Sequence, residues 1–170
     1  GVVNGTLSGV GTVTIDGDVV LGESGKITTD KLLVDGTLSA STKGLAMNTK
    51  TSAIEINGGM LTSKGKVSAA SLKLNGGSLS LSGALSVKDL TLGSGTLTLD
   101  NAKLTTVKVG NILELEGGTT LNLGFSVTEK DVAKGKSYKV FTFKTIDESI
   151  TDGNLNNLLG LGTDAATLAF

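Results

Sequence analysis

The sequence contains no cysteine, proline, histidine or tryptophan in 170 residues. Without cysteine, the chain can form neither a disulfide nor a thiolate metal site. Without histidine, its serine hydroxyls lack the base that commonly activates a serine nucleophile. Arginine is also absent, so all 15 basic residues are lysine. These absences remove many of the side chains from which enzymes build their sites, and we predict no catalytic residue, no cofactor and no metal site.

Charge is also sparse, at 18 % of the residues, and the net charge is −1. This balance lacks the basic patch expected of a protein that binds nucleic acid. No run of eighteen apolar residues is present, so no segment is expected to cross a membrane as a helix. We therefore expect no nucleic-acid partner and no direct membrane insertion.

Glycine is abundant, with 25 residues, and it separates short stretches in which apolar and small polar residues alternate. The stretch NGGSLSLSG at Asn75–Gly83 follows NGGMLTSKG at Asn57–Gly65 after an interval of 18 residues. Alternation with a period of two predicts strands that bury one face. A fixed short repeat of such strands predicts a solenoid, in which each coil buries its apolar face against the next.

Three windows of 18 residues, 58–75, 76–93 and 94–111, place their apolar residues in shared columns. The last window slips by one residue, at Leu104, Val107 and Val109. Stacking coils at the strand spacing of about 4.8 Å would bring each column together inside the solenoid. The predicted core therefore contains Leu61, Leu79 and Leu97 in one column, Val67 and Leu85 in a second, Leu72 and Leu90 in a third, and Leu74 and Leu92 in a fourth.

Glycines between the strands predict the corners of the coils, because glycine adopts the positive φ that tight corners need. The predicted corner residues are Gly58, Gly59, Gly76, Gly77 and Gly95. The fold class is therefore all-β, a parallel β-helix with about 18–24 residues per coil.

The pattern predicts coils over residues 1–124 and a C-terminal segment or cap of the same domain over 125–170. Residues 41–53 break the alternation and predict a looped excursion. In the C-terminal part, Thr128 to Gly135 predicts a short helix, and Tyr138–Ile146 predicts a strand. The stretch DGNLNNLLGLG predicts a helical turn, and ATLAF predicts a final strand. All five aromatic residues lie from Phe125 onward, which indicates a thicker terminal core.

The coils NGGSLSLSG and GSGTLTLD, followed by LNLGFSVTEKDVAKGKSYKVFTFKTI, resemble the passenger regions of bacterial autotransporters and their glycine-rich β-strand repeats. The resemblance covers residues 54–170 well and the first 53 residues loosely. It implies a right-handed parallel β-helix outside a Gram-negative-type cell, with a role in adhesion, self-association or display. That family has no shared catalytic motif, so the resemblance assigns no functional residue.

Several short motifs suggest ligand sites but lack the context that such sites need. GKS at Gly135–Ser137 has Lys130 where a phosphate-binding loop needs glycine. GVGTV at Gly9–Val13 lacks the third glycine and the helix of a dinucleotide site. Three aspartates, Asp16, Asp18 and Asp100, do not recur from coil to coil as calcium-binding repeats require. Coil corners are the simpler interpretation of all three.

Acidic pairs are candidate sites for glycan chemistry, and Thr-X-Thr pairs are candidate sites for ice binding. Glu114 and Glu116 would share one outward face, whereas Asp147 and Glu148 would point in opposite directions in a strand. The Thr-X-Thr pairs at Thr12–Thr14 and Thr96–Thr98 do not recur on every coil. We expect neither activity, although a glycan-active β-helix enzyme is a remote alternative.

The sequence favours a non-catalytic structural or adhesive module, extracellular or on a bacterial outer-membrane surface. Its expected contacts are a host or cell-surface ligand, copies of itself, or neighbouring segments of a longer chain through the solenoid ends. Neither GVVNGTLSGV nor ATLAF looks like a polar cap, so both ends are expected to be bare. A self-assembling subunit of an extracellular filament, joined through uncapped β-ends, is the alternative.

Overall fold

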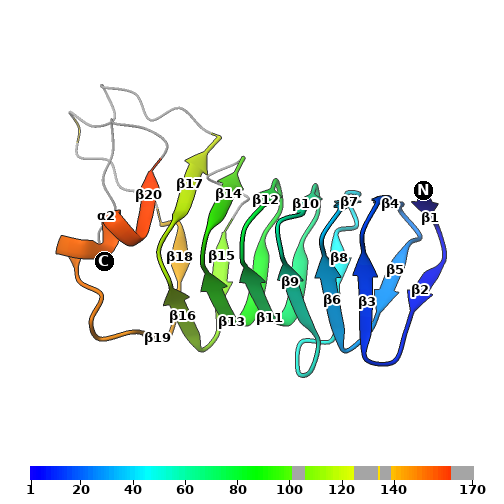
Figure 1. Cartoon of the computed structure of the whole chain (residues 1–170), viewed down its shortest axis with the longest axis horizontal. Helices are drawn as coiled ribbons and strands as arrows, with labels where there is room; N and C mark the ends of the chain where they lie inside the picture. The colour runs from blue at the N-terminus through cyan, green and yellow to red at the C-terminus, as the bar shows by residue number, and fades with distance from the viewer. Residues whose placement is uncertain (101–105, 125–133, 135–138, 162–170) are drawn as a thin grey trace.

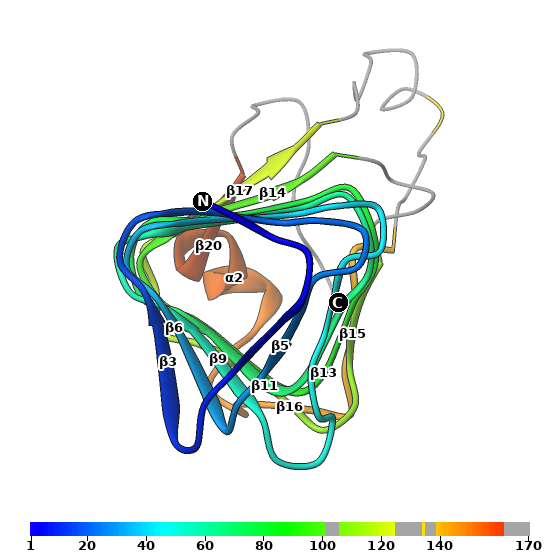
Figure 2. The same cartoon turned by 90° about the vertical axis from the view of Figure 1, so that its right-hand side faces the viewer.

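A computed structural model describes residues 1–100, 106–124, 134 and 139–161. The described chain is an all-β, parallel β-solenoid, as the sequence predicts. Successive coils are stacked along the long axis of the molecule (Figure 1). Viewed down that axis, the coils superpose into a three-sided outline (Figure 2).

One side is an eight-stranded sheet, called here the first sheet. All its pairings are parallel. In spatial order it contains β1 (Val2–Val3), β4 (Asp18–Leu21), β7 (Thr37–Ala40), β10 (Met60–Ser63), β12 (Ser78–Leu81), β14 (Gly95–Leu99), β17 (Thr119–Leu123) and β20 (Leu159–Leu161).

The other two sides share a ten-stranded sheet, called here the second sheet, and a separate two-stranded sheet. The long strands β11 and β13 join the two sides, since the first half of β11 pairs with β8 and its second half with β9. The second sheet contains β3 (Thr12–Ile15), β6 (Lys31–Val34), β8 (Leu45–Ala46), β9 (Ala53–Ile56), β11 (Val67–Leu74), β13 (Leu85–Leu92), β15 (Val107–Val109), β16 (Ile112–Leu115), β18 (Phe141–Thr142) and β19 (Thr145–Ile146). The two-stranded sheet pairs β2 (Thr6–Ser8) with β5 (Lys26–Thr28).

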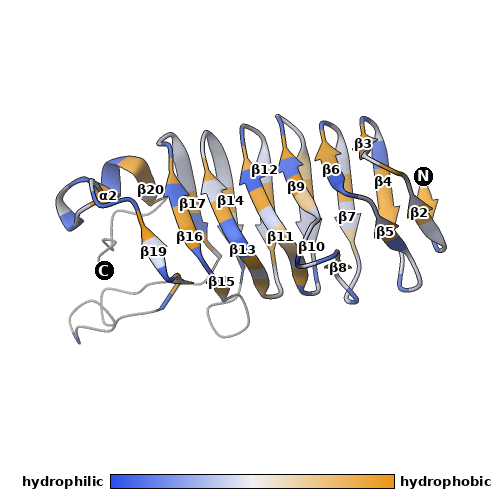
Figure 3. Cartoon of the chain, turned by 90° about the horizontal axis from the view of Figure 1, so that it is seen from below, coloured by the Kyte–Doolittle hydropathy of each residue, from blue (hydrophilic) through white to orange (hydrophobic). Residues whose placement is uncertain are grey.

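The interior is a set of apolar columns that run along the stack. Leu61, Leu79 and Leu97 lie side by side in register and are fully buried. Val67 pairs with Leu85, and β11 and β13 continue in register through the remaining predicted pairs, Leu72–Leu90 and Leu74–Leu92. Apolar positions recur from strand to strand along the whole stack (Figure 3). Each fully buried leucine contributes roughly 1.5–3 kcal/mol of transfer free energy, so the columns dominate the stability.

The predicted one-residue slip in the third window is wrong. Leu85 pairs with Val107 and Leu90 with Leu113, so this coil is 22–23 residues long, whereas the coil from β11 to β13 has 18. Most of the extra residues lie between β14 and β15, and one lies between β15 and β16. Leu104 lies outside the described residues. Val107 and Val109 are two residues apart, so they fit the Leu85 column and its neighbour as well as the Leu90 and Leu92 columns. Alternation shows which residues point inward, but it does not show how many residues a corner contains.

The predicted excursion at residues 41–53 is also too large. Leu45 is buried and pairs with Val67, so β8 continues the stack inside this range. Met47 is buried as well. Ser52 is buried, and its Oγ donates to the Thr29 carbonyl at 2.7 Å. Within this range, residues 42–43 and 48–51 are exposed, and each group contains a turn. The two-residue strand β8 is too short to show alternation, so the sequence pattern does not reveal it.

The glycine corners are set by two different constraints. Gly77 has φ +74°, and a Cβ there would lie 1.9 Å from the Gly59 carbonyl oxygen. Gly59 lacks the positive φ, but its Cβ would lie 2.5 Å from the Gly36 carbonyl oxygen. Gly58, Gly76 and Gly95 have positive φ. At Gly59, Gly77 and Gly95 the backbone of the neighbouring coil therefore lies too close for a side chain, whereas at Gly58 the positive φ is the constraint.

The C-terminal part departs from the regular coil. Two short strands, β18 and β19, occupy the region where one strand from Tyr138 to Ile146 was predicted. The predicted helical turn is α2 (Asp152–Leu158), whose start is fixed by a hydrogen bond from Thr151 N to Asn154 Oδ1 at 2.8 Å. The predicted helix near Thr128 and the final strand ATLAF lie outside the described residues.

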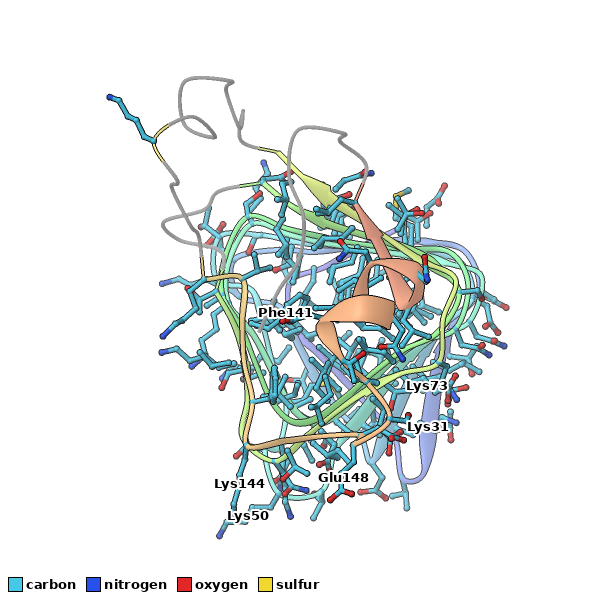
Figure 4. The ribbon with its side chains drawn as sticks, turned by 90° about the vertical axis from the view of Figure 1, so that its left-hand side faces the viewer. Lys31, Lys50, Lys73, Phe141, Lys144 and Glu148 are labelled. Atoms are coloured by element: carbon cyan, nitrogen blue, oxygen red, sulfur yellow. The ribbon has the colours of Figure 1, made fainter. Side chains whose placement is uncertain are left out.

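Helix α2 covers the C-terminal end of the interior. Its Leu155 is buried, and the flanking Ile150 and Leu159 belong to the same core. Opposite views along the axis both place α2 over the interior of the outline (Figures 2 and 4). At the other end, Val3, Leu7 and Val13 are only partly buried. The expectation of a bare C-terminal end rests on ATLAF, which lies outside the described residues.

Candidate interaction surfaces

The outer surface of the first sheet carries two rows of uncharged side chains, which we call the hydroxyl face. The strands β7, β10, β12, β14 and β17 pair in register, so their outward residues align from coil to coil. Hydroxyls dominate both rows, and no charged residue interrupts them. The hydroxyl face contains Thr37, Ser39, Met60, Thr62, Ser78, Ser80, Thr96, Thr98, Thr120 and Asn122.

The hydroxyl face can donate and accept hydrogen bonds without carrying charge. Contacts made there depend on shape and hydrogen bonding, because no charge steers a ligand toward it. The threonine pairs singled out in the sequence do not meet, since Thr12–Thr14 lies on β3 in the second sheet and Thr96–Thr98 on β14 in the first. The Thr-X-Thr pattern occurs in these rows only at Thr96–Thr98, because the other strands carry serine, methionine or asparagine at one or both outward positions. The signal that could have predicted the rows is the set of outward positions in each glycine-bounded strand.

The outer surface around the second sheet carries opposite charges, and we call it the charged face. Lys31 Nζ lies 2.6 Å from Glu55 Oε2, and Lys73 Nζ lies 3.3 Å from Glu116 Oε1. Thr91 Oγ1 donates to Glu114 Oε2 at 3.2 Å. Lys31 and Lys73 project from the same side of the stack (Figure 4). Exposed pairs of this kind contribute at most about 1 kcal/mol each.

The acidic residues considered for catalysis bind different partners. Glu114 accepts a hydrogen bond from Thr91, and Glu116 pairs with Lys73, so the two carboxylates serve separate cross-coil contacts. Asp147 lies after β19, in a turn, and the Ser149 backbone N–H donates to it at 2.8 Å. Hydrogen bonds from Ser149 lower the pKa of Asp147.

Of the three candidate calcium-binding aspartates, Asp100 lies far along the stack from Asp16 and Asp18. Asp16 and Asp18 flank the corner between β3 and β4, near the N-terminal end. Asp100 follows β14 and accepts a hydrogen bond from Ser82 Oγ at 2.9 Å. Among the described residues, no group of three or more acidic or other ligating side chains could hold a metal ion.

Two sequence motifs and several buried polar residues have structural positions. Gly9–Val13 forms the turn into β3, with Gly11 at φ +85°, and the GKS motif lies outside the described residues. Inside the stack, Ser63 Oγ donates to the Gly65 carbonyl at 2.8 Å, and Thr119 Oγ1 donates to the Gly93 carbonyl. Within the described ranges, every buried side-chain nitrogen or oxygen has a hydrogen-bond partner.

A corner contact also links neighbouring coils, since Asn75 Nδ2 donates to Asn57 Oδ1 at 3.1 Å. Stacked asparagine, serine and charged side chains therefore connect the coils on the outside, as the apolar columns connect them inside. No helix in the described part of the chain is long and apolar enough to span a membrane.

The sequence matches no protein-family model, and no curated protein or solved structure matches it either. The structure shows the β-solenoid fold. The likeness to autotransporter passengers rests on the pattern of glycines and strands alone.

Proposed function

We propose that this chain is a non-catalytic structural or adhesive module, exposed on the outside of a bacterial cell as autotransporter passengers are. Its role is geometric: the stack holds its outer faces in a fixed array at a distance from the surface that bears it. The observation that carries the proposal is the combination of fully buried leucine columns with the hydroxyl face directly outside them.

The interior of the stack is rigid, whereas the outward side chains are exchangeable. Every second residue of a strand points inward and fixes the register, so the alternate residues are free to suit a partner. The hydroxyl face is uncharged across five successive strands, although the opposite surface carries lysine and glutamate. A cell-surface ligand such as a neutral glycan, which offers hydroxyls of its own, suits the hydroxyl face.

The proposal is tested by labelling intact cells of the source organism with antibodies against the folded chain. We expect labelling of intact cells, with no increase after permeabilisation. Labelling that requires permeabilisation would contradict an exterior position. Antibodies against a cytoplasmic protein serve as the control for cell integrity.

The adhesive role is tested with beads that carry the purified chain. We expect binding to glycan-coated surfaces that is lost when Ser80 and Thr98 on the hydroxyl face are replaced by lysine. The matched control replaces Thr91, on the charged face, by lysine. This variant should keep the binding. Equal loss in both variants would place the contact elsewhere, and no binding by the unmodified chain would leave only the structural role.

Assembly into filaments through the solenoid ends is the alternative. At the C-terminal end helix α2 packs over the core, and β18, β19 and β20 each pair on one side only among the described strands.

A further inference from the structure

Two corners on successive coils share a short sequence in which asparagine precedes a pair of glycines. It reads INGG at residues 56–59 and LNGG at residues 74–77. At an asparagine–glycine step the backbone nitrogen readily attacks the side-chain amide, because glycine places no side chain around that nitrogen. The two steps have the same backbone shape, since Gly58 has φ +85° and Gly76 has φ +87°. Differences in their chemistry therefore come from their neighbours in the stack.

The attacking nitrogen is accessible at the first corner and occupied at the second. The Gly76 N–H donates to the Ser94 carbonyl at 2.7 Å, and Gly76 is half-buried. Gly58 is exposed, and its N–H has no hydrogen-bond partner among the described residues. The nitrogen must give up its proton before it attacks, so the bond to Ser94 has to break first and adds to the barrier. Gly58 therefore offers the more reactive nitrogen.

The amide under attack is also activated at the first corner. Asn75 Nδ2 donates to Asn57 Oδ1 at 3.1 Å, so a donor faces the oxygen on which negative charge develops when Asn57 Cγ is attacked. The amide oxygen of Asn75 faces Gly93 on the next coil, which has no side chain to donate. The third asparagine–glycine step likewise lacks this donor, because the amide oxygen of Asn4 lies over Gly22. Within the stacked pair, Asn75 is the donor and Asn57 is the substrate.

We infer that Asn57 is a self-modification site, at which the folded chain converts this asparagine to aspartate and isoaspartate with Asn75 as the promoting donor. The Gly58 nitrogen loses its proton to water and bonds to Asn57 Cγ. The tetrahedral centre then expels Nδ2 as ammonia and leaves a five-membered succinimide. Water opens the ring at Cγ to give aspartate, or at the backbone carbonyl to give isoaspartate.

The reaction consumes one water, releases one ammonia and needs no other reactant. It does not depend on where the protein acts or on what the hydroxyl face binds. In isoaspartate the chain continues through Cγ, so the corner also gains a backbone atom.

The product changes the charge of the corner. Asp35 lies beside Asn57 on the preceding coil, because Val34 and Ile56 are paired and the Asn57 N–H donates to the Val34 carbonyl at 3.0 Å. Conversion sets a new carboxylate next to Asp35 at the strand spacing of about 4.8 Å. Like charges on neighbouring strands are destabilising. The contact between these coils should therefore weaken as the molecule ages.

Peptide mapping of the aged chain tests the inference. Trypsin separates the two sites, because Asn57 is the single asparagine of residues 51–64 and Asn75 that of residues 74–88. The folded chain is held in mildly alkaline buffer, and conversion is followed by the mass gain of an amide-to-acid change. A second sample in guanidinium chloride is the matched control, since it removes the stack and keeps the nearly identical local sequences.

The measured quantity is the rate in the folded chain divided by the rate in the denaturant. This ratio should be several-fold higher at Asn57 than at Asn75. Equal ratios, or a higher ratio at Asn75, would overturn the inference. So would a folded chain that leaves Asn57 intact while the denatured sample converts.

Asn75→Ala tests the donor. Asn75 is exposed and lacks a positive φ, so alanine should leave the far-ultraviolet circular dichroism unchanged. Loss of the donor should slow conversion at Asn57 several-fold, whereas loosened packing would speed it, so the direction separates the two roles. Ser80→Ala, on the hydroxyl face, should leave the rate unchanged. An Asn57 rate in Asn75→Ala that equals or exceeds the parent rate would overturn the role of Asn75.

Asn57→Asp reproduces one product and tests the consequence. This variant should unfold at a lower temperature than the uncharged Asn57→Ser. The difference should shrink in high salt, because salt screens exposed charges. Equal midpoints for the two variants would overturn the predicted weakening of the corner.

Discussion

Replacing Leu79 by alanine tests the register on which the fold depends. Leu79 is 0 % exposed and lies between Leu61 and Leu97 in its column. Removal of its side chain leaves a cavity that leucines of both neighbouring coils cannot fill, because the inter-coil hydrogen bonds fix the strand spacing. Buried leucine-to-alanine changes cost about 2–5 kcal/mol. The rigid setting of Leu79 places the expected cost in the upper half of that range.

The cost is measurable as a lower midpoint of thermal unfolding. In a chain of this size, 1 kcal/mol corresponds to roughly 2–4 °C. Leu79→Ala should therefore lower the midpoint by on the order of 10 °C, followed by circular dichroism at the strand minimum. Ser80→Ala is the matched control, since Ser80 is the next residue on the same strand and points outward. Its effect should stay within about 0.5 kcal/mol.

Leu79→Asp makes the same test more severe. An unpaired carboxylate in the column must be buried or must open the coil, and either outcome costs several kcal/mol. A midpoint unchanged in both Leu79 variants would refute the proposed register, because it would place the side chain in solvent. A Ser80→Ala midpoint that falls as far as that of Leu79→Ala would refute the assignment of inward and outward faces.

Three further predictions concern the corners, the cap and the outer contacts. Gly77→Ala should destabilise the fold by about 1–3 kcal/mol in chemical denaturation, because of its φ of +74° and the Gly59 carbonyl beneath it; an unchanged midpoint would contradict that close approach. Leu155→Ala should loosen α2 and increase dye binding at the C-terminal end, whereas the exposed Asn157→Ala should not. Asp147 should titrate in NMR below its usual pKa. Because the folded-state pKa is lowered, its small stabilising effect is present above the unfolded-state pKa and is lost as pH falls through the folded-state pKa. Asp147→Asn should remove that dependence, and an ordinary pKa would contradict the Ser149 contact.

The sequence predicts the central coils well because local pattern and packing agree there. Over residues 58–93, alternation and an interval of 18 residues define both the strands and their partners, and the structure pairs Leu61 with Leu79 in that register. The prediction fails where corners change length. Neither the additional residues between β14 and β15 nor the two-residue strand β8 alters the period of two, so the sequence pattern is blind to both.

The surfaces are harder to predict than the core. Burial imposes an apolar side chain at Leu79, whereas nothing local requires that Ser80 and Thr98 lie in one row. That alignment depends on the inter-coil register, which the sequence shows only where coil lengths are equal. The covering of the core by α2 likewise depends on where the chain returns after residue 146, and Leu155 alone does not reveal it.

Negative-stain electron microscopy of the purified chain, over a range of concentrations, tests the account most directly. A stiff stack of coils should give discrete short rods with one long axis, as the fold predicts (Figure 1). Filaments of many units would favour the alternative, assembly through the solenoid ends. Rounded particles without a long axis would contradict the stacked solenoid itself.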